Sequence, residues 1–521
     1  MNIIYSVLKQ ATLSPHAPAV IQLDQSCGQK LVLSYETLIS EAAYLARQLS
    51  EYAEPRSHIG IVMGNTPAWV VADIALMLSD QIEVPVPLAF SAEQAAFLLS
   101  SCKIILTDET GADRLEQWRQ QAVTLPEITL AVGVCSGELR KDEPLTEFLP
   151  AQQDQVIKVI HTSGTTSTPK GVRIRSEGLN ELVRSLRACV NQDDYQCYLN
   201  LVPLSLLIEQ VTAIYMPLTS GGCLLMPPAD MAPLGDPGVT AEQRLNLIHQ
   251  TAPSAMTLTP ALVDALAEKA RQYDQHDERV QALFGSARVP LLAAGGAPVT
   301  KETLLELDGY GIPVYQGYGL SENSSVATWN HRGANRIGTV GKPLRHVEVR
   351  IAGDGELCIR SSSLFAGYAN QNDPSCCDLD DDGWLHTGDL ASQDQEGYIS
   401  VTGRKKTMII TANGRNISPE WLESAYQTLP GIFNVIVYGD QDQFLQGIFI
   451  VDPQADPGKL RQSVQDYAVQ HLNQIEHIRN PLFIPHSESV VRRLFTVTGR
   501  PRRKVIAEFM STYKGAQNAV C

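Results

Sequence analysis

Hydrophobic and polar positions change their spacing repeatedly along the first half of the chain. The segment that opens at Tyr35 and runs to about Leu49 repeats its apolar residues at helical spacing, and residues 69–78 give the same pattern. Short apolar runs at residues 59–63 and 104–107 predict buried strands. Strands that alternate with helices are typical of parallel sheets whose faces are covered by helices. We therefore predict an α/β fold with largely parallel sheets for this large N-terminal part.

The pattern becomes that of antiparallel strands after about residue 345. Residues 347–351 and 356–360 alternate as strands, and the glycines at positions 353 and 355 favour a tight turn between them. This stretch predicts a β subdomain attached to the helix-covered sheets.

A domain boundary is predicted near residue 403. Residues 402–406 form a charged link that contains a glycine, and a helix signal follows at Pro419, with Ser418 as its N-cap. We predict an N-terminal domain of residues 1–403 and a small C-terminal α+β domain of residues 404–521.

Composition narrows the class of protein. The chain has 57 acidic and 41 basic residues and a formal charge of −16, which argues against a general nucleic-acid binder. No apolar run approaches the ~20 residues of a membrane span, and the first residues lack the layout of a secretory signal. The ten cysteines form no zinc-like CxxC pairs, so we expect reduced thiols in a cytoplasmic protein.

The first candidate for chemistry is a run of small hydroxyl residues, glycines and one lysine. Its hydroxyl donors are Thr162, Ser163, Thr165, Thr166 and Thr168. Gly164 and Gly171 allow the backbone to approach an anion, and Lys170 adds a point positive charge. Residues 156–160 predict a strand directly before the run, so the loop leaves the edge of a sheet. The run predicts a phosphate-holding loop without Walker spacing; the alternative is a solvent-facing turn.

Five further motifs follow this loop in order. They are Gly295-Gly296-Ala297-Pro298, Tyr318-Gly319-Leu320-Ser321-Glu322, Gly383-Trp384-Leu385-His386-Thr387-Gly388-Asp389-Leu390, Gly403-Arg404-Lys405-Lys406 and Asn413-Gly414-Arg415-Asn416-Ile417-Ser418-Pro419-Glu420. In this order the six motifs resemble the adenylate-forming superfamily of acyl-CoA synthetases, carrier-protein-loading adenylation domains and luciferases. Residues 202–209, which end in Glu209, are similar to a proline-leucine segment of the long-chain acyl-CoA synthetase branch.

The resemblance implies an activity and its cofactors. ATP and Mg²⁺ would activate a carboxylic acid, most readily a medium- or long-chain fatty acid, to an acyl-adenylate. The acyl group would then pass to CoA or, as an alternative, to the phosphopantetheine of an acyl-carrier protein. The C-terminal domain would be mobile and would rotate between the two steps, with Lys406 at the hinge and Gly414 lining the pantetheine tunnel.

The resemblance also implies a role for each site residue. The phosphate loop, Thr162, Ser163, Gly164, Thr165, Thr166 and Lys170, would hold the β- and γ-phosphates. Tyr318, followed by Gly319, would stack on the adenine opposite a wall of Gly295, Gly296 and Ala297. Ser321 would donate to the α-phosphate and Glu322 would hold Mg²⁺. Asp389 would accept hydrogen bonds from the ribose hydroxyls, and Arg404 would reach the ribose or a phosphate.

The sequence departs from the family near its end. Arg500 stands where the family has a catalytic lysine, and arginine does not reproduce a compact ammonium. Three interpretations stay open. Arg500 takes the role of the catalytic lysine, Lys504 takes that role, or adenylation is impaired and the chain is a nucleotide-binding pseudoenzyme. The basic cluster Arg492, Arg493, Arg500, Arg502, Arg503 and Lys504 is either a solvated face or a patch for CoA phosphates or an acidic carrier protein.

Overall fold

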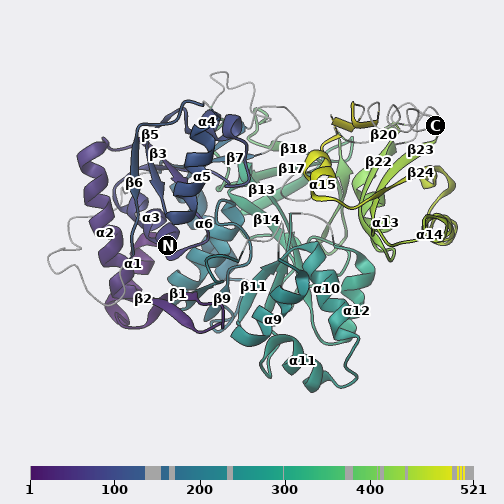
Figure 1. The fold of residues 1–521 in the computed structure, drawn as a ribbon, viewed down its shortest axis with the longest axis horizontal. Coiled ribbons are helices and arrows are strands. Elements are labelled where there is room, and N and C mark those ends of the chain that lie inside the picture. Colours follow the sequence, from purple (N-terminus) through teal and green to yellow (C-terminus); the bar gives the residue numbers. More distant parts are fainter. Residues whose placement is uncertain are drawn as a thin grey trace.

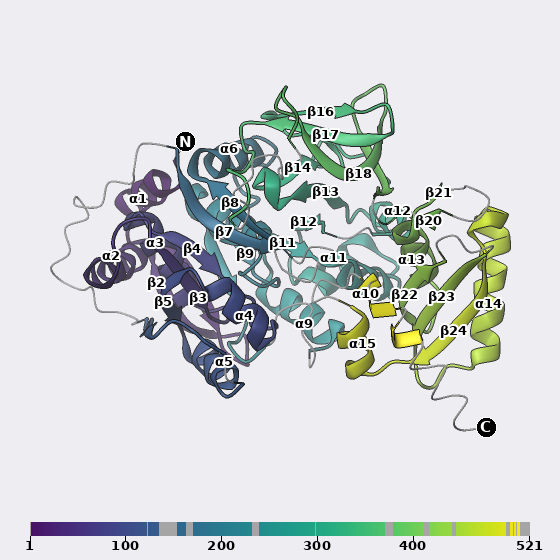
Figure 2. The same cartoon turned by 90° about the horizontal axis from the view of Figure 1, so that it is seen from above.

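The computed structural model describes most of the chain and is built on two large sheets (Figure 1). The described residues are 2–510, without 122, 135–153, 163–169, 232–238, 297–298, 370–378, 406, 408, 411–415, 440–443, 496–500, 504 and 507. Figure 1 and Figure 2 both place the elements from β20 onward at one end of the molecule.

The first sheet has six strands in the order β6-β5-β3-β4-β7-β8. The strands are β3 (His58–Val62), β4 (Ile82–Pro85), β5 (Cys102–Thr107), β6 (Ile128–Ala131), β7 (Val156–Thr162) and β8 (Lys170–Arg175). All neighbours are parallel except β7 and β8, which form an antiparallel pair at the edge.

The second sheet has nine strands in the order β15-β14-β13-β12-β11-β9-β10-β1-β2. The strands are β1 (Pro18–Leu23), β2 (Gln29–Ser34), β9 (Cys197–Leu199), β10 (Cys223–Met226), β11 (Ala255–Leu258), β12 (Leu291–Ala294), β13 (Val314–Leu320), β14 (Ser325–Trp329) and β15 (Lys342–Pro343). The run from β1 to β13 is parallel, and antiparallel pairs close both edges.

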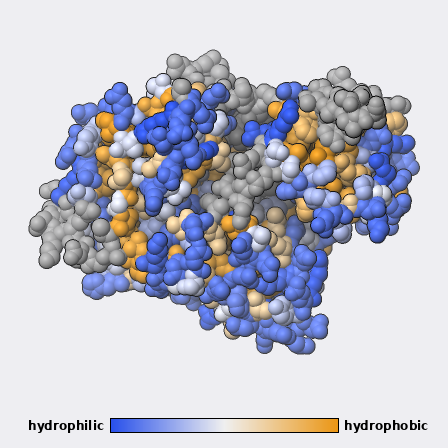
Figure 3. Space-filling model, in the orientation of Figure 1, coloured by the Kyte–Doolittle hydropathy of each residue, from blue (hydrophilic) through white to orange (hydrophobic). Residues whose placement is uncertain are grey.

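Helices join and cover these strands. They are α1 (Ile3–Leu13), α2 (Tyr35–Tyr52), α3 (Pro67–Leu78), α4 (Ala92–Leu99), α5 (Glu109–Arg119), α6 (Ser176–Arg187), α7 (Leu207–Glu209), the π-helix η2 (Gln210–Tyr215), α8 (Met216–Ser220), α9 (Ala241–Thr251), α10 (Pro260–Ala270), α11 (His276–Phe284), α12 (Lys301–Gly309) and the short η3 (Ser321–Asn323). No helix in the described part of the chain is both long and apolar enough to cross a membrane. On the face shown in Figure 3, the described residues are mainly hydrophilic, with hydrophobic patches between them.

The later part of the chain forms smaller sheets. An antiparallel sheet contains β16 (Val347–Ile351), β17 (Glu356–Ser361), β18 (Leu385–Gln393) and β19 (Ile399–Arg404). After it come β20 (Ile409–Ile410), β21 (Asn416–Ile417), α13 (Pro419–Gln427), β22 (Ile432–Tyr438), β23 (Leu445–Val451), α14 (Pro457–His471), η5 (Gln474–Glu476), β24 (Ile478–Pro485) and α15 (Glu488–Leu494). Two clusters of buried apolar side chains consist only of residues from this last part.

A buried ionic cluster ties the two large sheets together. Lys158 of β7 is 1% exposed and pairs with both Asp73 of α3 and Glu83 of β4. From η2, Tyr215 donates to Asp73 at 2.8 Å and Gln210 donates to Glu83 at 3.0 Å. The strand that leads into the phosphate loop is therefore held to the π-helix by buried polar contacts.

The predicted fold class is confirmed, including the parallel sheets and the β subdomain. The helix predicted from Tyr35 begins there, because the Ser34 hydroxyl accepts from the amide of Thr37 at 3.1 Å. The helix start predicted at Ser418 and Pro419 is confirmed: Ser418 is the N-cap residue of α13 and Pro419 its first residue, although the Ser418 side chain makes no capping hydrogen bond. β19 extends to Arg404, into the segment 402–406 predicted as a link, because Arg404 pairs with Asp389 across the sheet.

Candidate active site

The Tyr318–Glu322 motif lies where β13 ends and η3 begins. β13 carries Tyr318 and Gly319, and η3 opens with Ser321, followed by Glu322. A Cβ atom at Gly319 would lie 1.6 Å from the carbonyl oxygen of Ser325, so the backbone passes too close for any side chain. The glycine of this motif is therefore required by close approach within the fold.

A strained turn follows Glu322. Ser324 and Ser325 have φ values of 54° and 111°, which non-glycine residues rarely adopt. The Ser324 hydroxyl donates to the carbonyl of Ser363 at 2.7 Å, and the Ser363 hydroxyl lies 3.0 Å from Nε2 of His346. Burial lowers the pKa of His346 to about 4, so its ring is neutral in this network. These buried contacts hold the turn and thereby the orientation of Glu322.

Asp389 joins the tyrosine of this motif to the last residue of β19. The Tyr318 hydroxyl donates to Asp389 Oδ2 at 2.6 Å, and Arg404 Nε donates to Oδ1 at 2.7 Å. Asp389 is 3% exposed, and burial together with this carboxylate raises the pKa of Tyr318 well above its ordinary value. The Tyr318 hydroxyl therefore stays protonated and donates a hydrogen bond to Asp389. Each carboxylate oxygen retains a second lone pair for another donor.

The glycines after β12 lie beside the same strand. Ala294 is paired with Gln316 in the parallel β12–β13 ladder, so Gly295 comes level with Gly317. A Cβ atom at Gly295 would be 3.4 Å from the Gly317 carbonyl oxygen. At Gly296, whose φ is 80°, a Cβ atom would meet no described heavy atom within 4 Å. Both glycines therefore lie near the strand that carries Tyr318 without projecting a side chain there.

Lys170, Tyr368 and Glu322 meet at the other end of the motif. Lys170 begins β8, and its Nζ lies 4.6 Å from the centre of the Tyr368 ring. The Tyr368 hydroxyl donates to Glu322 Oε1 at 2.9 Å. Sequence reasoning missed Tyr368; the only local signal for it is an aromatic residue directly after Gly367.

Gly171 has a packing role within the fold. A Cβ atom there would lie 2.9 Å from Val159 Cγ1, 3.0 Å from His161 Nε2 and 3.1 Å from Ala369 Cβ. The glycine therefore admits a neighbouring segment of the same chain, and the predicted approach of its backbone to an anion stays a prediction.

Several predicted site residues lie outside the described residues. They are Ser163, Gly164, Thr165, Thr166, Ala297, Lys406, Gly414, Arg500 and Lys504, together with the side chain of Thr162. Their borders are described: Thr162 and Lys170 pair across the β7–β8 hairpin, and Phe495 pairs with Pro501 around the near-terminal motif.

The basic cluster near the end is not a free surface at Arg503. Its guanidinium donates to both carboxylate oxygens of Glu423, at 2.9 and 2.8 Å, and to the carbonyl of Val437 at 2.8 Å. Arg502 Nε donates to the carbonyl of Phe495 at 2.8 Å. The interpretation of Arg503 as part of a phosphate or carrier patch is therefore wrong, because this side chain holds α13 and β22 together.

The described residues fit a cation that is held mainly by its own substrate. Among them, no group of three or more His, Cys, Asp or Glu side chains could surround a metal ion. Glu322 offers one carboxylate, which accepts from the hydroxyl of Tyr368, the residue whose ring faces Lys170. Mg²⁺ commonly uses one or two protein carboxylates together with substrate phosphates and water, so a single glutamate suits it.

Glu209 is a second buried carboxyl group and lies in a polar cluster. It is 0% exposed, and it accepts from Asn200 Nδ2 at 2.5 Å and from the Tyr198 hydroxyl at 3.2 Å. The Tyr198 hydroxyl also lies 2.8 Å from the Thr257 hydroxyl of β11. The cluster fixes the start of the π-helix above the parallel strands.

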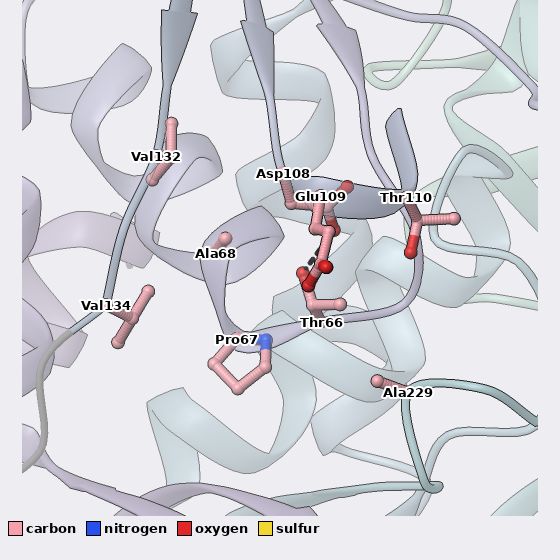
Figure 4. A pocket seen from close by; sticks show the side chains of 9 residues that line it. All are labelled: Thr66, Pro67, Ala68, Asp108, Glu109, Thr110, Val132, Val134 and Ala229. Carbon is pink, nitrogen blue, oxygen red and sulfur yellow. Dashed lines mark hydrogen bonds between the residues drawn. The ribbon is translucent and has the colours of Figure 1, made fainter. Parts of the chain in front are cut away.

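A hollow of about 200 Å³ opens elsewhere, at the carboxyl ends of β3 and β5 (Figure 4). Thr66 donates to Asp108 Oδ2 at 2.7 Å on its floor, with Pro67, Ala68 and Val132 around them. None of the predicted site residues that the structure describes lines this hollow.

Comparison with known proteins places this geometry in a family. The sequence matches the family described as AMP-binding enzyme over residues 7–369, and the chain belongs to that family. It is 25% identical to the long-chain-fatty-acid–CoA ligase ACSBG2 of Xenopus laevis, over 90% of this chain and 72% of that protein. It is 28% identical to the long-chain-fatty-acid–CoA ligase FadD15 of Mycobacterium bovis, over 84% of each.

A solved structure shares the fold. It is the O-succinylbenzoate coenzyme A synthetase MenE of Bacillus subtilis in complex with ATP and a magnesium ion, with a TM-score of 0.74 and 22% identity. The match covers 96% of this chain and 98% of that one.

Proposed function

We propose that this chain is an AMP-forming acid–thiol ligase that activates a medium- or long-chain fatty acid and transfers it to CoA. Membership of the AMP-binding enzyme family supports this, as do the names of the two relatives. In the first step a carboxylate oxygen attacks the α-phosphorus of ATP and pyrophosphate leaves. In the second step the thiol attacks the acyl carbon and AMP leaves.

One observation carries the proposal. The Tyr318 hydroxyl and Asp389, 71 residues apart, meet at 2.6 Å, and Glu322 follows Tyr318 in the next element. An aromatic ring and an acceptor-only carboxylate are thus in contact, and a second carboxylate, which Tyr368 links to Lys170, follows four residues after Tyr318 in the chain. These are the groups that a base, a ribose and a metal-bound triphosphate need.

We assign the residues accordingly. Tyr318 stacks on the adenine beside Gly295, while Asp389 accepts from the ribose hydroxyls through its remaining lone pairs. Lys170 holds the β- and γ-phosphates, and Glu322 holds Mg²⁺, which neutralises charge on the phosphates. Ser321 opens η3 beside Glu322 and donates to the α-phosphate.

The same proposal assigns different roles to two domains of the chain. We divide the chain into residues 1–403 and 404–521, and the separate apolar clusters of the second part support this division. Lys406 serves as the hinge of a mobile C-terminal domain, and Gly414 lines the path of the thiol. Arg500 or Lys504 contributes the charge near the acyl carboxylate. A cytoplasmic location stays a prediction from the cysteine content.

The test is to identify products. Purified protein is incubated with ATP, Mg²⁺, CoA and straight-chain acids from acetic to stearic acid, and AMP and acyl-CoA are quantified by mass spectrometry. The proposal predicts AMP and acyl-CoA in equal amounts for one range of chain lengths. If AMP is released only when a carrier protein is added, that protein rather than CoA is the acceptor. Nucleotide binding without formation of AMP would favour the pseudoenzyme.

A further inference from the structure

Residues 365–369, which we call the strap, join η3 to the strand that follows the phosphate loop. On one side the strap extends the sheet, because the amide of Ala369 donates to the carbonyl of Gly171 at 2.7 Å. On the other side the amide of Phe365 donates to the carbonyl of Glu322 at 2.9 Å. The backbone of the strap thus fixes β8 relative to the turn that carries Glu322.

Tyr368 is the side chain of the strap that lies between two opposite charges. The residue is 5% exposed, and Lys170 Nζ lies 4.6 Å from the centre of its ring. Its hydroxyl donates to Glu322 Oε1 at 2.9 Å. Within the described part of the chain no ion pair involves Lys170 or Glu322, although their charges attract each other. The tyrosine therefore contacts the cation with its face and the anion with its hydroxyl.

A direct ion pair would take both groups out of use, since each would be bound to the other. We propose that Tyr368 is a positioning residue that keeps Lys170 and Glu322 apart, so that the ammonium stays available to phosphate and the carboxylate to a divalent cation. The inference rests on the proposed function. Because the hydroxyl holds Oε1, the other carboxylate oxygen, Oε2, is oriented for the cation, as outer partners of metal ligands commonly do.

Two substitutions separate the two contacts. Tyr368→Phe keeps the ring against Lys170 and removes only the hydroxyl. We expect it to raise the Mg²⁺ concentration that half-saturates ATP binding about tenfold and to leave metal-free ATP affinity unchanged. Tyr368→Leu removes both contacts and lets Glu322 pair with Lys170. We expect it also to weaken ATP binding without metal, while AMP binding, which lacks the outer phosphates, is unchanged.

Calorimetric titration of ATP and AMP into the full chain, with and without Mg²⁺, measures these effects. Adding Glu322→Gln to Tyr368→Leu removes the anion, so metal-free ATP affinity should return. Phe365→Leu is the packing control, since that ring contacts Tyr368 edge-on at 5.0 Å; it should lower the melting temperature without moving the Mg²⁺ requirement.

The outcomes are distinct. If the wild type binds ATP with Mg²⁺ and Tyr368→Phe leaves the Mg²⁺ requirement unchanged, the inference fails and the proposed function stands. If Phe365→Leu moves the Mg²⁺ requirement as much as Tyr368→Phe, the effect is one of packing and the inference also fails. If the wild type binds no ATP, both the inference and the proposed function are overturned.

Discussion

Asp389 and Glu209 are both buried carboxyl groups, but their surroundings differ. Asp389 contacts the guanidinium of Arg404, whereas Glu209 meets an amide and hydroxyl groups from Asn200 and Tyr198. Burial of Glu209 raises its pKa to about 8, and its hydrogen bonds offset only part of this effect. Glu209 therefore makes the free energy of unfolding fall as the pH rises.

Replacing Glu209 with glutamine should stabilise the protein more in alkaline than in acidic solution. A raised carboxyl pKa contributes stability that is fully present below the ordinary value of 4.5 and is lost as the pH rises through about 8. Glu209→Gln removes this loss and keeps the shape of the side chain. The gain in unfolding free energy relative to wild type should grow by on the order of 3 kcal/mol between about pH 5 and about pH 9.

Chemical denaturation of the wild type and of Glu209→Gln at the two pH values measures this difference in unfolding free energy. Equal differences at both pH values would show that Glu209 is charged in the folded state at neutral pH. The pKa of about 8 assigned to it would then be wrong.

At the scale of elements, the junction of β13 and η3 depends on a glycine. A Cβ atom at Gly319 would sit 1.6 Å from the Ser325 carbonyl, inside a turn that already has two residues with positive φ. Gly319→Ala should therefore destabilise the protein by on the order of 3 kcal/mol and weaken ATP binding, because Glu322 moves with the turn. Gly309→Ala at the end of α12 is the matched control, since a Cβ there meets nothing within 4 Å.

Thermal unfolding and ATP titration of the two variants check this account. A Gly319→Ala protein as stable as Gly309→Ala would mean that the turn yields easily. The positive φ values of Ser324 and Ser325 would then not be what positions Glu322.

Elements set by local pattern were predictable, and contacts between distant elements were not. The helix at Tyr35 and the strands at 347–351 and 356–360 follow from spacing and capping, so the sequence contains them directly. Arg503 appeared as a surface charge because its partner Glu423 lies 80 residues away. Tyr368 escaped notice for the same reason, because its importance lies in its contacts with two other elements.

At the scale of the whole molecule, the candidate site gathers residues from both large sheets and the antiparallel subdomain. Lys170 comes from the six-stranded sheet, Tyr318 from the nine-stranded sheet and Asp389 from β18. The two residues proposed to contribute to acid activation, Arg500 and Lys504, lie in the C-terminal part and outside the described residues. The central claim is therefore that the residues of this candidate site activate a carboxylic acid.

Carboxylate-dependent exchange of labelled pyrophosphate into ATP, without any thiol, tests that claim most directly. The assay uses straight-chain and aryl acids, with Arg500→Ala and Lys504→Ala beside the wild type. We predict exchange with fatty acids of one length range and its loss in one of the two variants. Tight ATP binding without exchange for any acid would contradict it and would leave a protein that binds nucleotide without activating an acid.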